Sequence, residues 1–238
     1  MSVTLTPGIK VTDTLIPVIA IDGPSGSGKG TIARRVAERL GYHLLDSGAL
    51  YRLTAVSAQK CGLRLDDAEA VAGIARIARD LDVTFDSNDD GSERILLDGE
   101  DVTLVVRKES TGAGASTVAA IPAVRAALLD RQRAFQQAPG LVADGRDMGT
   151  FVFPSALVKI FLTASAEERA RRRHKQLKDK GMDVSLAALS RDIEDRDRRD
   201  SERSVAPLKP AEDARILDSS GLSIEAVTNT VLEWVAEL

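Results

Sequence analysis

The sequence predicts an α/β protein built on a doubly wound parallel sheet of five strands with helices on both faces. Short apolar runs, typical of buried parallel strands, occur at 18–21, 42–45, 141–143, 158–162 and 215–217. Segments with the helical spacing of apolar residues separate these runs. Because strands that alternate with helices form parallel sheets, this order predicts the fold class.

The first strand leads directly into a glycine-rich loop and a helix. Residues 18–31 read VIAIDGPSGSGKGT, with the pattern G-x-x-x-x-G-K complete at Gly23, Gly28 and Lys29. Glycines let backbone N–H groups curl around one anion, and the helix N-terminus adds partial positive charge. A glycine-rich turn without a ligand is the alternative, but the strand and helix on either side favour a phosphate-binding loop (P-loop). Its residues are Gly23, Pro24, Ser25, Gly26, Ser27, Gly28, Lys29, Gly30 and Thr31.

One position of this loop departs from the general motif. Gly30 stands where a Ser or Thr usually supplies a hydroxyl to Mg²⁺, and Thr31 follows one residue later. We expect Thr31 to take that role. The ending GKGT resembles that of nucleoside monophosphate kinases.

The second predicted helix begins at 46–52, DSGALYR. Asp46 or Ser47 is the expected N-cap, and Arg52 lies one turn into the helix. A helix start rich in small residues can hold a phosphate, and a fixed guanidinium can bind it through two hydrogen bonds. An ordinary capped helix with an exposed arginine is the alternative.

The middle of the chain changes its periodicity. The pattern is helical over 66–81, and short strands are expected at 83–85, 94–97 and 101–106, with turns at 88–91 and 98–99. These runs predict a small antiparallel sheet inserted into the α/β frame. Residues 111–118 are small and polar, and Pro122 is expected to begin a helix that ends near Pro139.

The strand at 141–143 ends in Asp144, Gly145, Arg146 and Asp147. Open α/β sheets bind ligands at the carboxyl ends of their strands. In P-loop enzymes an Asp at a strand end orients Mg²⁺, usually through water. An Asp here can also simply form a turn, but two Asp and one Arg in four residues favour a site.

Two charged helices follow. The first begins at a capping box at 165–168 and carries Arg169, Arg171, Arg172 and Arg173. We predict a mobile lid that brings arginines to a transferred phosphate, with a solvated or RNA-contacting face as the alternative. With five Phe, two Tyr and one Trp, the chain has few residues on which bases could stack. On the next helix, at 186–204, either a surface stripe of opposite charges or a substrate-facing row is expected from Asp192, Arg196, Asp200 and Arg203.

Composition limits the protein class. The 238 residues are 43% hydrophobic and 29% charged with a net charge of −4, which predicts a globular protein and argues against a surface that coats nucleic acid. Cys61 is the single cysteine, so no intramolecular disulfide forms, and we expect it to pack within its helix. Residues 1–16 are expected to form a flexible N-terminal extension, with a targeting segment as the less favoured alternative. The chain has no signal segment or long apolar span, so we predict a cytoplasmic protein.

Several blocks together resemble the bacterial cytidylate kinases, across about 18–238. These blocks are IDGPSGSGKGT, LLDSGALYR, ASTVAAIPAVR, ADGRDMGT, VKIFL, the arginine-rich stretch to RSVAPL, and ILDSSGLSIE. The resemblance implies transfer of phosphate from ATP to CMP or dCMP, with Mg²⁺ as cofactor. It implies one kinase domain over 17–238, a monophosphate-binding insertion over 47–140 with its small sheet at about 82–106, and a lid over 165–182.

The resemblance also implies residue roles. Residues of the loop would hold the ATP phosphates together with Arg169, Arg172 and Arg173, and Thr31 and Asp144 would bind Mg²⁺, partly through water. The catalytic residues would be Lys29, Asp144, Arg146 and Arg196. CMP would contact Ser47, Tyr51, Arg52, Ser116, Arg125, Gly145, Arg146, Asp147, Arg196, Asp200 and Arg203. Within that set, the resemblance places Ser116, Arg125 and Asp147 near the cytosine.

The chemistry of the bases gives a specificity prediction. Cytosine offers an amino donor at N4, which the carboxylate of Asp147 can accept, and two acceptors to which Arg125 and Ser116 can donate. Uracil has a carbonyl at position 4, so we predict a preference for CMP over UMP by a factor on the order of 10² or more. Two other functions stay open from the sequence: a P-loop kinase for another small acceptor, and a regulatory protein that binds nucleotide or RNA. We expect a monomer with no nucleic-acid or membrane partner.

Overall fold

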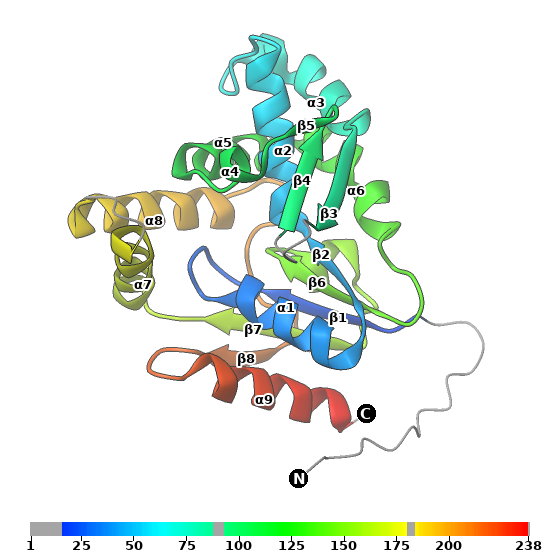
Figure 1. The fold of residues 1–238 in the computed structure, drawn as a ribbon, viewed down its shortest axis with the longest axis vertical. Coiled ribbons are helices and arrows are strands. Elements are labelled where there is room, and N and C mark those ends of the chain that lie inside the picture. The colour runs from blue at the N-terminus through cyan, green and yellow to red at the C-terminus, as the bar shows by residue number, and fades with distance from the viewer. Residues whose placement is uncertain (1–15, 88–92, 180–183, 238) are drawn as a thin grey trace.

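A parallel sheet of five strands lies at the centre of the molecule (Figure 1). The computed structural model describes residues 16–87, 93–179 and 184–237. The strand order is β2 (His43–Asp46), β6 (Leu141–Gly145), β1 (Val18–Asp22), β7 (Val158–Thr163) and β8 (Arg215–Asp218). All four neighbouring pairs are parallel. The predicted five-stranded parallel sheet is therefore confirmed.

Alternate residues of β1 enter two different cores. Val18 and Ala20 belong to a cluster with side chains of α2 (Ser47–Lys60). Ile19 and Ile21 pack on the other face against α1 (Lys29–Leu40) and α9 (Ile224–Ala236). Since a strand buried on both faces must be apolar at successive positions, this arrangement accounts for the continuous run VIAI. Helices on both faces are confirmed.

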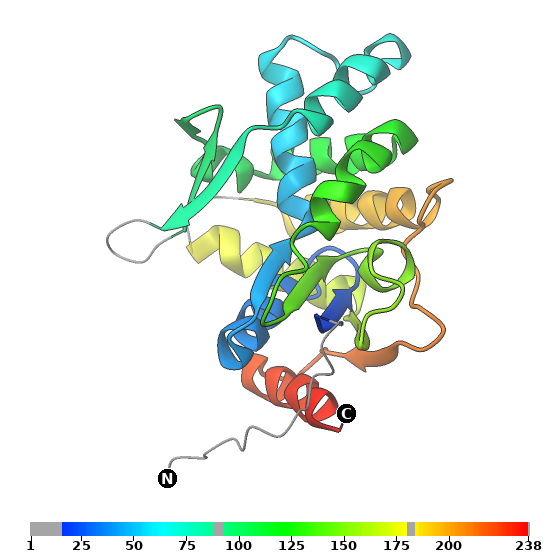
Figure 2. The same cartoon turned by 90° about the vertical axis from the view of Figure 1, so that its right-hand side faces the viewer.

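Beyond one end of the parallel sheet lies a second group of elements, which the long helix α2 enters (Figures 1 and 2). In this group α2 packs against α5 (Glu109–Ala119), and α3 (Val71–Arg79) packs against α6 (Pro122–Arg133). It also contains β3 (Val83–Ser87), β4 (Glu93–Leu97) and β5 (Glu100–Asp101). These strands form an antiparallel sheet in the order β3-β4-β5, which confirms the predicted small sheet.

The strand predicted at 101–106 is wrong for most of its length. β5 ends at Asp101, and Thr103–Val106 form the short helix α4. The β-branched residues there favour a strand locally. However, the Asp101 carboxylate accepts a hydrogen bond of 2.9 Å from the Thr103 backbone, and this local bond turns the chain into a helix.

Other boundaries also differ. The helix predicted over 66–81 divides into a 3₁₀ turn, Ala68–Ala70, and α3, because Asp67 caps the turn through the Glu69 backbone at 2.9 Å. The small polar segment at 111–118 lies within α5. Helix α6 ends at Arg133 rather than near Pro139. Just after its end, the Phe135 backbone N–H donates to the Gln132 carbonyl. Cys61 is exposed at the end of α2, so its expected packing role is wrong.

The two charged helices are α7 (Ala166–Asp179) and α8 (Leu186–Ser201), which pack against each other. A short π-helical turn, η2 (Met148–Val152), follows β6 and was not expected from the sequence. Residues 1–15, the turn at 88–91 and the lid residues 180–182 lie outside the described residues. Among the helices described, none alone is long and apolar enough to cross a membrane; α5 and α6 pass that test only as a pair bent by 101°.

Candidate active site

The loop after β1 is shaped by glycines that other residues could not replace. A Cβ at Gly23 would lie 2.0 Å from the Leu162 carbonyl oxygen, and Gly26 and Gly28 have φ values of 78° and 91°. Helix α1 begins at Lys29, directly after Gly28. The predicted order of strand, loop and helix is therefore present, with the helix N-terminus behind the loop.

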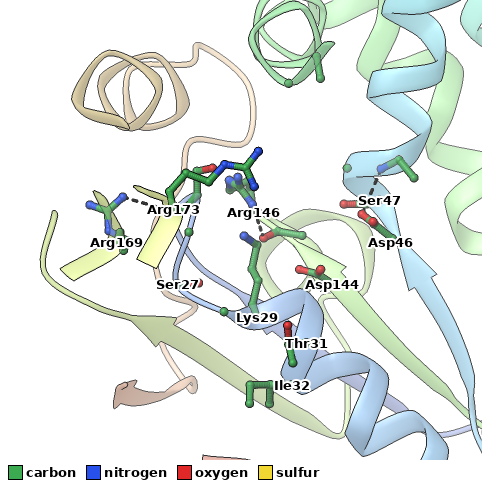
Figure 3. A pocket seen from close by; sticks show the side chains of 18 of the residues that line it. Ser27, Lys29, Thr31, Ile32, Asp46, Ser47, Asp144, Arg146, Arg169 and Arg173 are labelled. Carbon is green, nitrogen blue, oxygen red and sulfur yellow. Dashed lines mark hydrogen bonds between the residues drawn. The ribbon is translucent and has the colours of Figure 1, made fainter. Parts of the chain in front are cut away.

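Two buried charges of opposite sign lie at the start of α1 (Figure 3). Lys29 donates a hydrogen bond of 3.0 Å from Nζ to the Pro24 carbonyl, and burial lowers its pKa. Burial raises the pKa of Asp144, which lies within β6 and is paired with Ile21 of β1. Both shifts mean that each charge lacks the solvent it would otherwise have. Oδ1 of Asp144 has no hydrogen-bond partner among the described residues.

Gly30 explains how Asp144 reaches the loop. A Cβ at this position would lie 3.0 Å from Oδ2 of Asp144, which is closer than most real Cβ contacts. A Ser or Thr, as in the general motif, would therefore push against the carboxylate. Thr31 is exposed on the first turn of α1, and it lines a cavity that most residues of the loop also line.

A group of arginines faces the loop from three other elements. Arg52 extends from α2, Arg196 from α8 and Arg146 from the segment after β6. A Cβ at Gly112 would lie 3.4 Å from both the Arg52 and the Arg196 guanidinium, so this glycine leaves room for both. Burial lowers the pKa of Arg196 to about 10, with Arg146 and Arg52 adding repulsion. Clustered cations of this kind favour an anion between them.

The arginines of α7 divide between two sides. Arg169 donates to the Ser25 carbonyl at 3.0 Å and pairs with Asp197 at 2.6 Å. Arg172 donates to the Ser219 carbonyl at 2.6 Å. Arg173, predicted together with them, pairs instead with Glu109 at the start of α5. Arg173 therefore connects α7 to the elements beyond the sheet.

A second cluster is almost fully buried and holds paired charges. Arg125 and Asp147 form an ion pair, with side chains 2% and 3% exposed. Arg125 also lies 5.8 Å from the ring centre of Tyr51, whose pKa burial raises to about 12. Burial raises the pKa of Asp147, and Arg125 opposes that rise. Charges this deep need partners, and a polar ligand can supply further ones.

Asp200 joins this cluster to the arginine group. Its carboxylate accepts from Arg146 Nε at 2.9 Å and from Ser116 Oγ at 3.3 Å, and it also pairs with Arg203. The side chain is 3% exposed, and the arginines lower its pKa against the effect of burial. The charged residues of α8 were expected to form either a surface stripe or a substrate-facing row. For Asp200 the surface stripe is therefore wrong.

One cavity of about 1490 Å³ joins the loop, the arginines and the buried cluster. All but four of the predicted site residues line it; the exceptions are Gly23, Pro24, Gly30 and Arg125. Arg125 is nearly inaccessible and pairs with Asp147, which does line the cavity. Ser47 lines it too, and a Cβ at Gly145 would lie 2.7 Å from the Ser47 hydroxyl.

Sequence reasoning missed several residues of this cavity. Glu109 holds two arginines, and Gly112 makes room for two. Asp197 was also missed; it holds Arg169 but does not itself line the cavity. Leu222 and Ile224 line the cavity although they are 45% and 47% exposed. Their position after the carboxyl end of β8 was a usable signal, because ligands of open α/β sheets bind at that edge.

The sheet, the loop and the cavity at its carboxyl edge define a P-loop nucleotide-binding protein of the α/β class. Comparison with known proteins narrows the class. The family model for cytidylate kinase matches residues 19–237. The chain belongs to the cytidylate kinase family.

Individual relatives agree with this assignment. The cytidylate kinase of Pseudomonas paraeruginosa is 62% identical over 218 residues, which cover 91% of this chain and 94% of that one. The cytidylate kinase of Stutzerimonas stutzeri is 60% identical over 223 residues, covering 93% and 96%. A crystal structure of an uncharacterized protein from Eubacterium ventriosum, 9% identical, covers 94% of this chain and 100% of its own with a TM-score of 0.50, and it shows the fold alone.

Proposed function

We propose that the protein transfers the γ-phosphoryl group of ATP to CMP or dCMP, giving ADP and CDP or dCDP. An oxygen of the acceptor phosphate attacks the γ-phosphorus, and the bond to the oxygen bridging the β- and γ-phosphorus atoms breaks. The observation that supports this best is that one cavity joins the phosphate loop to the buried Arg125–Asp147 cluster, in a chain of the cytidylate kinase family. Such a reaction needs positioning and charge stabilisation more than covalent chemistry.

On the donor side, the loop backbone from Gly23 to Thr31 holds the triphosphate. Lys29 exchanges its bond to the Pro24 carbonyl for bonds to the β- and γ-phosphates, whose negative charge compensates for the solvation that burial removes. Arg169 and Arg172 already contact carbonyls of the loop or its neighbour Ser219, so they are placed to stabilise charge on the transferred group. The exposed apolar pair Leu222 and Ile224 suits the adenine.

The residues at the loop fit a Mg²⁺ ion held with few protein ligands. In the part of the chain that the structure describes, no three His, Cys, Asp or Glu side chains form a metal cage. Mg²⁺ bound with nucleotide keeps several waters and takes one or two carboxylates. Asp144 offers a buried oxygen that has no hydrogen-bond partner in the described part of the chain, and Thr31 offers a hydroxyl. When bound, the ion neutralises charge on the phosphate oxygens.

On the acceptor side, the arginine group binds the phosphate of CMP. Arg52, Arg146 and Arg196 face one space from three elements, and Ser47 lies beside Gly145 at the edge of β6. Arg146 and Arg196 line the cavity together with the loop residues, so we expect them to act on both the ground state and the developing charge. The remaining contacts, from Tyr51, Asp200 and Arg203, belong to the ribose, base or phosphate.

The buried cluster reads the base. Asp147 accepts from the cytosine amino group, while Ser116 and Arg125 donate toward the ring acceptors. Arg125 must turn part of its fork from Asp147 to do so, and its Nε has no partner among the described residues. UMP would place a carbonyl against the Asp147 carboxylate, so a preference for CMP on the order of 10² follows.

We further propose the domain organisation and setting that accompany this reaction. Residues 17–238 form the kinase domain, with 47–140 the monophosphate-binding insertion and 165–182 the lid. Arg173 supports the lid role, since it reaches across from α7 to Glu109. The protein acts as a monomer in the cytoplasm, without nucleic-acid or membrane partners.

A coupled ADP-release assay with ATP and Mg²⁺ tests the proposal against CMP, dCMP, UMP, AMP and GMP. Turnover confined to CMP and dCMP is expected. Turnover with another monophosphate would keep the reaction class and discard Ser116, Arg125 and Asp147 as readers of cytosine. No turnover with any of the five would contradict the proposal and direct attention to small-metabolite acceptors, and then to RNA or nucleotide binding without catalysis.

A further inference from the structure

Asp22 is a buried carboxylate that the proposed reaction does not use. It ends β1, immediately before Gly23 of the phosphate loop, and it is 5% exposed. Its Oδ1 accepts a hydrogen bond of 2.8 Å from the Met148 backbone, and its Oδ2 accepts one of 2.8 Å from the Gly149 backbone. One side chain at the donor loop therefore holds two consecutive N–H groups of the segment that follows β6.

Those two N–H groups belong to the first two residues of η2, and Asp147 is its N-cap residue. An Asp at the N-cap usually accepts with its own side chain from the N–H of the second or third helical residue, here Gly149 or Thr150. Among the described residues, the Asp147 side chain makes no such bond and pairs with Arg125 instead. Asp22 accepts from Gly149 in its place, and it accepts from Met148 as well.

The free-energy cost of burying Asp22 indicates that its hydrogen bonds to η2 are important. Burial raises the pKa of Asp22 to about 7, and the hydrogen bonds from Gly149 and Met148 oppose that rise. No cation pairs with the Asp22 carboxylate among the residues that the structure describes, and burying an unpaired charge costs free energy. Its two donors lie directly after Asp147 and within three residues of Arg146, so its position controls both of these side chains.

We propose that Asp22 is a positioning residue that ties the donor loop to the acceptor-reading segment and frees Asp147 to face the base. This proposal rests on the proposed function. It predicts that loss of the Asp22 carboxylate changes acceptor recognition more than donor binding, because the loop glycines and Lys29 keep their own contacts while Arg146 and Asp147 lose their anchor.

The test compares Asp22→Asn with the wild-type protein and with Asp67→Asn. Asp67 is a matched control, since its carboxylate also accepts from the backbone of a short helical turn, at 2.9 Å, but it is exposed and does not line the cavity. Steady-state rates with CMP and UMP, and the Kd of ATP by calorimetry, are measured well below the thermal transition of each variant. In Asp22→Asn we expect kcat/KM for CMP and the CMP-to-UMP ratio each to fall about tenfold or more. The Kd of ATP should change less than about threefold, and Asp67→Asn should match the wild type.

An unchanged CMP-to-UMP ratio in Asp22→Asn, with only a lower thermal midpoint, would overturn the proposal and leave Asp22 a purely structural residue. Amide hydrogen exchange of Met148 and Gly149 in the wild-type protein gives a second test that needs no variant. Slow exchange is expected, and exchange as fast as in an exposed turn would also overturn it. Wild-type turnover with CMP reports on the proposed function, whereas the change between wild type and variant reports on Asp22.

Discussion

Replacing Arg125 with Met should destabilise the protein and, separately, weaken its recognition of the base. Arg125 and Asp147 are 2% and 3% exposed, so the substitution leaves a buried carboxylate without its main cation. The methionine keeps an apolar stem between the rings of Tyr51 and Phe151, which lie 5.8 and 5.7 Å from the Arg125 guanidinium carbon. The loss therefore reports mainly on charge rather than on packing.

The size of the effect follows from the burial of the pair. Removing one partner of a buried ion pair costs about 3–5 kcal/mol. In a chain of this length that lowers the thermal midpoint by roughly 6–20 °C. The double variant Arg125→Met/Asp147→Asn removes both charges and should recover at least half of the lost stability, but not the preference for CMP. Urea unfolding followed by circular dichroism gives the free energies of unfolding, and the ADP-release assay gives the preference.

The stability difference between the wild type and Arg125→Met should also depend on pH. Burial already raises the pKa of Asp147, and Arg125 holds it down. In Arg125→Met that pKa rises further, so the carboxyl takes up a proton at a higher pH and the penalty shrinks on acidification. The difference in stability between wild type and variant should thus narrow as the pH falls from 8 to 5. A loss below about 1 kcal/mol, a difference independent of pH, or a double variant as unstable as the single one would refute the reasoning.

Two further substitutions test the donor side. Lys29→Ala should lower kcat by a factor of about 10² or more, because it removes a donor to developing charge. The circular dichroism spectrum and stability of Lys29→Ala should stay close to those of the wild type, because the substitution also removes the cost of burying a charge. Near-normal turnover would contradict the role of the loop. Gly30→Ala places a Cβ 3.0 Å from the Asp144 carboxylate. We expect kcat to fall about tenfold and half-maximal activity to need more Mg²⁺, while ATP binding measured without Mg²⁺ is unchanged. An unaltered Mg²⁺ titration would show that the carboxylate moves aside freely.

Local patterns predicted most of the frame around the site. The apolar runs placed all five parallel strands, and the glycines with Lys29 placed the phosphate loop, because these features depend on residues close in sequence. Asp46 is the N-cap of α2, accepting from the Ala49 backbone at 3.1 Å, and it was one of the two residues expected there. The strand prediction for 101–106 was wrong because one local hydrogen bond outweighed the strand preference of these residues.

Which charged side chains meet depends on how distant parts of the chain pack together. Asp200 lies 54 residues from Arg146 and 84 from Ser116, yet all three are joined, and Asp22 bonds to residues 126 and 127 positions away. No periodicity encodes such pairs, since they arise from where the sheet and α8 bring their ends together. Local sequence was therefore enough to predict the five parallel strands, the donor loop and the kinds of side chain at the sheet's edge. It was not enough for α4 or η2. Packing determined which arginines face an anion, which carboxylates are already paired, and how the donor and acceptor sides share one cavity.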